Sequence, residues 1–150
     1  MPIGVQGYTV RYRAYTPELV EKAYQKISQM GYDGLETGLG GHFMPLEDDA
    51  ALLKKYGLKA AAAYADLADP DEAMKRAGVY GVKLLGLPSI PGEMLNSPDG
   101  FYVYAAKLNE MAKPFSNTGF KLQYHNHSQE FRNFPQLNGK AGLAKSRGFH

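Results

Sequence analysis

His125 and His127 are two of the four histidines of the chain, and a carboxylate follows them at Glu130. The apolar run at residues 120–124 predicts a buried strand, and because side chains alternate along a strand, both histidines should point to one side. Imidazole with carboxylate is a ligand set favoured by Zn, Mn, Fe or Co. The segment therefore predicts metal-assisted chemistry. The alternative is that both histidines only form hydrogen bonds at a rim and that Glu130 is a solvated loop carboxylate.

Four further residues lie at or after the ends of predicted strands. Glu36 ends the second strand and could transfer a proton or orient hydroxyl groups, with a plain strand-end charge as the alternative. Tyr8 and Arg11 follow the first strand, where the arginine could pair with a phosphate or carboxylate, although a salt bridge beside a helix explains it equally well. His42 lies in a glycine-rich stretch and could reach a substrate, although a surface histidine is the commoner case.

Composition limits the possible classes of protein. The 150 residues and 44% hydrophobic content suit one globular domain, and without cysteines only His, Asp and Glu remain as strong metal ligands. The net charge of +2 is spread along the chain, so nucleic-acid binding is not expected. No segment has the pattern of a signal peptide or a membrane span, and a cytoplasmic protein is expected.

Four glycines recur at the junctions between helix-like and strand-like stretches: Gly31, Gly57, Gly81 and Gly119. A helix commonly ends with a residue in the left-handed conformation, which glycine adopts without penalty, before the chain returns to a sheet. The repeat therefore predicts strands at residues 3–6, 34–36, 58–64, 82–87 and 120–124.

Helices should alternate with these strands. Thr16, Asp69 and Ser97 each precede a proline and an acidic residue, which is the pattern of a capped helix start, and Met44-Pro45-Leu46-Glu47 is a weaker version. In the first helix the apolar positions form one stripe that should be buried: Leu19, Val20, Ala23, Tyr24, Ile27 and Met30.

Alternating strands and helices predict an α/β protein with a parallel sheet, either open and doubly wound or curled into a barrel. The first strand runs into Gly7-Tyr8-Thr9-Val10-Arg11, which lacks the glycine-rich phosphate loop of the open form, so a barrel is favoured and no organic cofactor is expected. We expect a barrel-type sheet of about five strands and four helices over residues 1–132. A polar, irregular tail should follow over residues 133–150.

Four segments form a further pattern: residues 4–11 (GVQGYTVR), 30–36 (MGYDGLE), 55–59 (KYGLK) and 124–127 (YHNH), the last followed by Glu130 and Phe131. Together they resemble the sugar phosphate isomerase/epimerase family with the xylose isomerase-like barrel, over about residues 3–140. The resemblance implies a (β/α)8 barrel, present here only in part. It also implies that the barrel binds a divalent metal (Mn, Co, Zn or Mg) and a sugar or cyclitol, and that it moves a proton next to a carbonyl.

Position and resemblance together give the candidate residues their expected roles. Glu36 and Glu130 are expected to be catalytic, and His127 and Glu130 to be metal ligands. Four residues are expected to contact substrate: Tyr8, Arg11, His42 and His125.

The chain departs from the family pattern in two ways. Tyr124 stands where the sugar epimerases usually have a glutamate ligand, and only five of eight strands are expected, since a whole barrel needs at least about 200 residues. The tail reads as an arbitrary ending, so we expect a truncated barrel with an incomplete active site. Two alternatives stay open: a non-catalytic half-barrel that covers its open edge by self-association, and, remotely, an endonuclease that acts on abasic DNA.

Overall fold

The computed structural model describes residues 1–36, 43–64, 66 and 68–131. His42 and the predicted tail at residues 133–150 lie outside these ranges. Along the chain the elements are β1 (Gly4–Gln6), η1 (Gly7–Arg13), α1 (Pro17–Gln29), β2 (Gly34–Glu36), α2 (Leu46–Lys55), β3 (Lys59–Tyr64), α3 (Pro70–Val79), β4 (Leu84–Leu87), η3 (Gly92–Asn96), α4 (Pro98–Ala112), η4 (Lys113–Phe115), β5 (Lys121–Tyr124) and η5 (Ser128–Phe131), where η marks a 3-10 helix.

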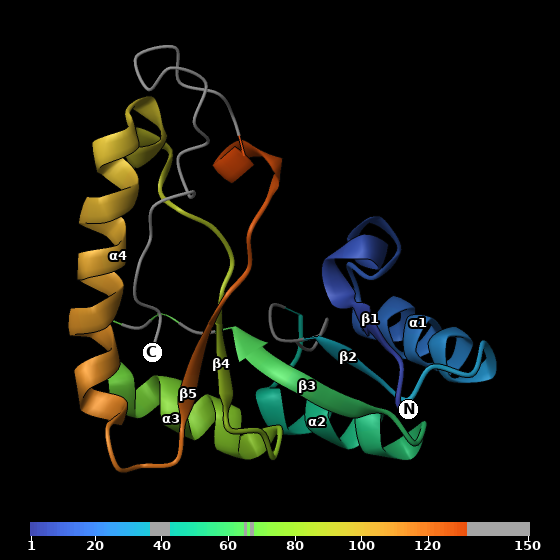
Figure 1. The fold of residues 1–150 in the computed structure, drawn as a ribbon. Coiled ribbons are helices and arrows are strands. Elements are labelled where there is room, and N and C mark those ends of the chain that lie inside the picture. Colours follow the sequence, from blue (N-terminus) through green and yellow to red (C-terminus); the bar gives the residue numbers. More distant parts are fainter. Residues whose placement is uncertain (37–42, 65, 67, 132–150) are drawn as a thin grey trace.

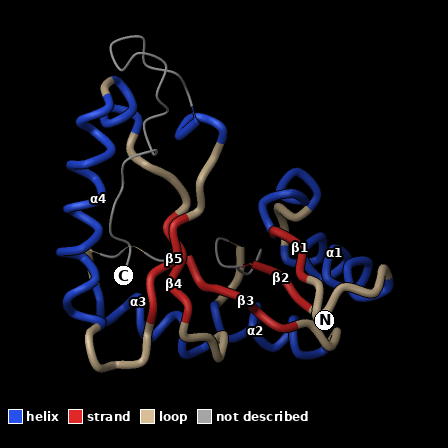
Figure 2. Tube along the Cα trace, in the orientation of Figure 1, coloured by secondary structure: helices blue, strands red, loops and turns tan. Residues whose placement is uncertain are grey.

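The strands form one parallel sheet in the order β1-β2-β3-β4-β5. Figure 1 shows that the row of strands is curved, and in Figure 2 the four α-helices lie along its outer side. A doubly wound sheet reverses its strand order at a switch point, whereas a barrel adds each strand beside the last. The predicted partial barrel of five strands and four α-helices is therefore confirmed within the described residues.

The predicted helix boundaries are confirmed by their hydrogen bonds. Thr16, Asp69 and Ser97 accept hydrogen bonds through their side chains from backbone N–H groups in the first turns of α1, α3 and α4, at 3.1 to 3.3 Å. α2 begins after Pro45 without a side-chain cap. The four junction glycines all have positive φ, between 68° and 85°, as the left-handed helix ending requires.

Apolar side chains fill the space between the sheet and the helices in two clusters. One cluster gathers Val20, Tyr24 and Ile27 of α1 against Leu35 of β2, and the other gathers residues of α3 and α4 against β4. Met30 was predicted to belong to the buried stripe of α1, and this prediction is wrong. The residue is 71% exposed, and it lies at the C-terminal cap of α1, beyond the packed turn.

A buried carboxylate joins three of the helices. Asp49 of α2 is fully buried and accepts hydrogen bonds from the hydroxyl groups of Tyr24 and Tyr80, at 2.6 and 2.5 Å. Burial and the hydrogen bond to Asp49 raise the pKa of Tyr80, so this hydroxyl keeps its proton. The contact fixes α1 and the end of α3 on either side of α2.

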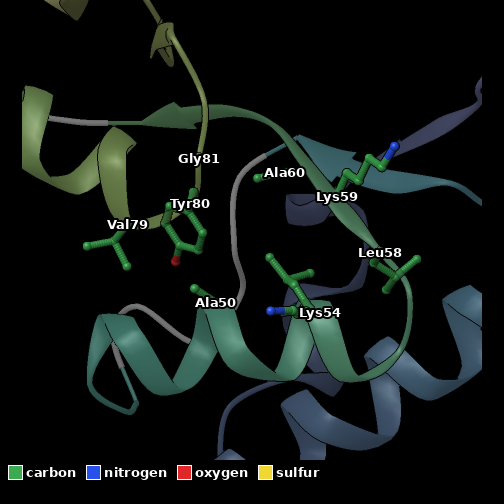
Figure 3. Close-up of a pocket in the computed structure, with 9 residues that line it drawn as sticks. Ala50, Lys54, Leu58, Lys59, Ala60, Val79, Tyr80 and Gly81 are labelled. Carbon is green, nitrogen blue, oxygen red and sulfur yellow. The ribbon is translucent and has the colours of Figure 1, made fainter.

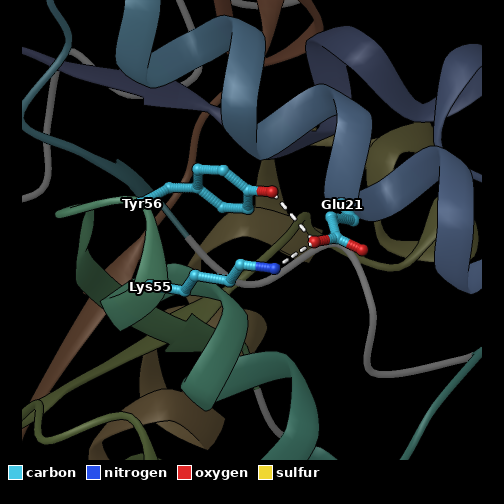
Figure 4. A network of polar contacts seen from close by, with 3 residues as sticks. All are labelled: Glu21, Lys55 and Tyr56. Carbon is cyan, nitrogen blue, oxygen red and sulfur yellow. Dashed lines mark hydrogen bonds and ion pairs between the residues drawn. The ribbon is translucent and has the colours of Figure 1, made fainter.

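Two further features lie between the helices. Glu21 of α1 accepts hydrogen bonds from Lys55 and Tyr56 at the end of α2, at 2.6 and 2.9 Å (Figure 4). This exposed contact lowers the pKa of Glu21, first through the hydrogen bond from Lys55, and raises the pKa of Lys55. A shallow cavity of about 320 Å³ lies between α2, β3 and the end of α3, with Lys54 and Tyr80 in its lining (Figure 3).

A bulge in β3 decides which side chains face the inside of the curve. Leu35 of β2 pairs with Ala60, but Glu36 pairs with Ala62, so one extra residue is inserted at Ala61. Because side chains alternate along a strand, this insertion reverses the faces of all later residues in β3. Ala63 consequently enters the core with α3 and α4, and Tyr64 is turned to the inner face.

Candidate functional site

The last residues of the strands gather polar side chains on the inner face of the sheet. Glu36 ends β2, Tyr64 ends β3, and His125 follows directly after β5. The Tyr64 hydroxyl lies 3.1 Å from Nδ1 of His125, and the same nitrogen lies 3.7 Å from Oε2 of Glu36. We name these three residues the strand-end cluster. It lies at the carboxyl end of a parallel sheet, where barrel enzymes place their ligand sites.

The Tyr64 ring crosses β4 to reach His125, which directly follows β5. Gly86 of β4 pairs with Tyr64, and a Cβ atom added to Gly86 would lie 2.5 Å from the Tyr64 ring. A side chain at this position would therefore displace the ring. Burial, followed by the charge of Glu36, raises the pKa of Tyr64 to about 12, so the hydroxyl remains protonated at neutral pH.

A second contact closes the curve of the sheet from β2 to β5. Nε2 of Gln123 donates a hydrogen bond to Oε1 of Glu36 at 2.7 Å, although β2 and β5 are not neighbours in the sheet. A cavity of about 330 Å³ lies beside this pair, with Gln6 of β1 and Ala62 of β3 also in its lining. Oε1 of Gln6 is buried without a hydrogen-bond partner, so a polar group in the cavity could bind to it.

Glu130 has different surroundings from Glu36. It is 1% exposed, and its two oxygens accept hydrogen bonds from the Tyr124 hydroxyl and from the backbone N–H of His127, the latter at 2.8 Å. Tyr124 alternates with Gln123 along β5 and packs against Tyr104 of α4 on the helix side. Glu130 is therefore not a solvated loop carboxylate.

Tyr8 and Arg11 lie in η1, where they contact one another. The Arg11 guanidinium stacks on the rings of Tyr8 and Tyr12, at 3.9 and 4.1 Å from their centres. Its two terminal nitrogens donate to the Tyr8 carbonyl and the Tyr12 hydroxyl. Among the described residues the structure brings neither Tyr8 nor Arg11 into hydrogen-bond contact with the strand-end cluster, so their contact with substrate remains a prediction.

The described residues do not fit a complete metal site. The rings of His125 and His127 have their centres 4.9 Å apart, so the two histidines do lie close together. Across the described ranges, however, no group of three or more His, Asp or Glu side chains is arranged to hold a metal ion. The predicted metal ligands His127 and Glu130 therefore remain a prediction. His42 cannot be placed in relation to them.

Three residues of this site were missed at the sequence level: Tyr64, Gln123 and Gln6. Their positions could have indicated two of them. Gln6 and Tyr64 are each the last residue of a strand, as Glu36 is. Gln123 could have been recognised from its alternation with the apolar Leu122 and Tyr124. The inward position of Tyr64 depends on the bulge at Ala61, for which the alanine run of β3 gives no signal.

No family model and no curated protein matches the sequence. Solved structures do match. A sugar phosphate isomerase/epimerase from Parabacteroides distasonis ATCC 8503 has a TM-score of 0.65 and 20% identity, over 88% of this chain and 53% of its own. The D-allulose 3-epimerase from a Methylomonas species, in complex with D-allulose, has a TM-score of 0.55 and 19% identity, over 83% and 50%.

An AP endonuclease of family 2 from Brucella melitensis also matches, with a TM-score of 0.56 and 14% identity over 93% of this chain and 58% of its own. At these identities the likeness shows the fold alone, and it confirms the partial barrel that the sequence predicts. The chain spans between a half and three fifths of the length of these three proteins. Within the described ranges, none of the helices combines the length and the hydropathy of a membrane-spanning segment.

Proposed function

We propose that this chain carries part of the site of a sugar isomerase or epimerase, and that the strand-end cluster binds a sugar or cyclitol. The observation that supports the proposal most strongly is the meeting of Glu36, Tyr64 and His125 at the carboxyl end of a parallel sheet. Carboxylate, hydroxyl and imidazole groups suit the hydroxyl and carbonyl groups of a sugar. The sugar phosphate isomerase/epimerase and the D-allulose 3-epimerase of the same fold agree with this substrate class.

In this proposal Glu36 moves the proton next to the substrate carbonyl. Its carboxylate is held by Gln123, and the Glu36 side chain is 18% exposed, so it is oriented but still accessible. A general base needs this combination of fixed geometry and reach. His125 binds a substrate hydroxyl beside Glu36, and Tyr64 holds the His125 ring in place. Metal binding at His127 and Glu130 remains part of the prediction, but no step of this reaction is assigned to a metal.

Proton exchange with solvent tests this proposal. Incubation of the chain with D-allulose in D₂O, with and without Mn²⁺ or Co²⁺, should place deuterium on the carbon next to the carbonyl, as read by NMR. The variant Glu36→Gln should lose the exchange, whereas Glu93→Ala, which changes an exposed side chain of η3, should keep it. Exchange at the rate of a protein-free control would refute proton transfer by this chain.

A second candidate function is a half-barrel that associates with another copy of itself. Within the described residues β1 and β5 each have one strand neighbour, so each leaves one row of backbone groups unpaired. Unpaired edges favour pairing with a further chain. Light scattering in solution should then give twice the mass of the chain or more. A monomer that unfolds cooperatively would exclude self-association.

A further inference from the structure

The hydrogen bonds of the strand-end cluster can be arranged in two ways. In the first, the Tyr64 hydroxyl donates to a bare Nδ1 of His125. In the second, Nδ1 carries a proton and donates to the Tyr64 oxygen, while the Tyr64 hydrogen turns towards Glu36. The 3.1 Å distance between the Tyr64 oxygen and Nδ1 suits both arrangements.

The charge of Glu36 separates the two arrangements. An ionised carboxylate accepts hydrogen bonds and donates none, and hydrogen bonds to it are roughly twice as strong as those between neutral groups. Oε2 of Glu36 lies 3.7 Å from Nδ1 of His125. A bare nitrogen would turn its lone pair towards this negative charge, whereas an N–H group would turn a partial positive charge towards it.

The pKa of Tyr64 also depends on the Glu36 carboxylate. After burial, the charge of Glu36 and a hydrogen bond to it are the main causes that raise the pKa of Tyr64. This agrees with a Tyr64 hydrogen that turns towards Glu36. A hydrogen bond from Gln6 to the Tyr64 oxygen acts in the opposite direction and lowers the pKa. The oxygen has two lone pairs, so it can accept from His125 as well as from Gln6.

We infer that Glu36 and Tyr64 hold the proton of neutral His125 on Nδ1, so that Nε2 carries a lone pair and accepts a hydrogen bond from a substrate hydroxyl. The His125 side chain is 28% exposed, which leaves part of the ring accessible. In this arrangement Tyr64 is a positioning residue, because it acts through His125. The identity of the donor, a sugar hydroxyl, rests on the proposed function, whereas the position of the proton does not.

Two features of the backbone place Tyr64 for this role. The bulge at Ala61 turns its side chain to the inner face, and Gly86 leaves space for the ring above β4. A regular β3 strand would direct Tyr64 to the helix side, away from His125. The contact therefore depends on both features together.

The wild-type protein gives the first test. Ring ¹⁵N shifts of the histidines are measured by NMR at about pH 8.5, above the ordinary imidazole pKa of about 6.5, in the presence of EDTA. The variant His125→Gln assigns the signals. We expect a pyrrole-type Nδ1 and a pyridine-type Nε2 for His125. A pyridine-type Nδ1 would overturn the inference without any variant.

Two matched variants test the part played by Tyr64. Tyr64→Phe should move the His125 ring nitrogens towards equal shifts, because the proton is no longer held on Nδ1. Tyr104→Phe is the control, since the Tyr104 hydroxyl donates to the Ser89 carbonyl on the helix side, and it should leave the His125 shifts unchanged. Unchanged shifts in a folded Tyr64→Phe protein would refute the positioning role. If that variant does not fold, Glu36→Gln takes its place with the same expected shift and the same refuting result.

Addition of D-allulose separates this inference from the proposed function. A hydrogen bond to Nε2 should shift that nitrogen upfield and leave Nδ1 nearly unchanged. If Nδ1 is pyrrole-type but no sugar moves Nε2, the proton assignment stands and the sugar as its donor is refuted.

Discussion

Glu130 illustrates how far a residue can be interpreted before the fold is known. Its place three residues after His127 marks it as chemically relevant, and in the structure it does lie beside the His127 backbone. The burial of Glu130 is not visible in the sequence, because it depends on how Tyr124 packs against α4. Glu36 was easier to place, because a charge at the end of a strand is visible in the sequence itself.

The variant Glu130→Ala should destabilise the protein. It leaves the Tyr124 hydroxyl and the His127 N–H without their acceptor in a buried position, so the free energy of unfolding should fall by roughly 3 kcal/mol. Urea unfolding followed by circular dichroism measures this change. The control is Glu93→Ala, which should change stability little. Equal stability of Glu130→Ala and wild type would mean that Glu130 does not hold the β5 end in place.

The buried carboxylate of Asp49 should also be sensitive to substitution. Asp49→Ala leaves the hydroxyls of Tyr24 and Tyr80 without this acceptor, with an expected loss of about 3 kcal/mol in the free energy of unfolding. Asp48→Ala removes a carboxylate from the same helical turn, but Asp48 is exposed, so its loss should be much smaller. Similar losses for the two variants would show that only the charge at the start of α2 matters.

At the scale of elements, local chemistry predicts where helices begin and end. The oxygen cap before a proline at Thr16, Asp69 and Ser97 and the four junction glycines act within a few residues, so the sequence reveals them. The β3 bulge is different. It arises from how β2 and β3 fit together, and a run of alanines does not reveal which residue will be inserted. Tyr64 was missed for this reason.

The β2–β3 pair leaves no room for a side chain at Gly34. A Cβ atom there would lie 2.1 Å from the Lys59 carbonyl oxygen, so Gly34→Ala should push the strands apart and lower the free energy of unfolding by about 1–3 kcal/mol. Gly4 pairs with Gly34 across β1 and β2, but its nearest atom would be 3.5 Å away. Gly4→Ala is therefore the matched control in thermal unfolding, and a Gly34→Ala protein as stable as this control would contradict the tight pairing.

At the scale of the whole molecule, the curved sheet brings distant segments into one site. Glu36 and Gln123 are 87 residues apart, yet they share a hydrogen bond because β2 to β5 follow the wall of a barrel. The order of strands and helices predicts this class of fold. The identity of the cross-barrel contacts depends on the degree of curvature, which no local pattern encodes.

The most direct test of the account is to locate the sugar on the protein. D-allulose is titrated to about 10 mM, above the usual KM range, while backbone amide shifts are followed by NMR. The account predicts that the largest shifts fall on Glu36, Tyr64, Gly86 and His125, and that Glu36→Gln weakens them. No shifts over this range, or shifts confined to the cavity between α2 and α3 in Figure 3, would contradict a sugar site at the strand-end cluster.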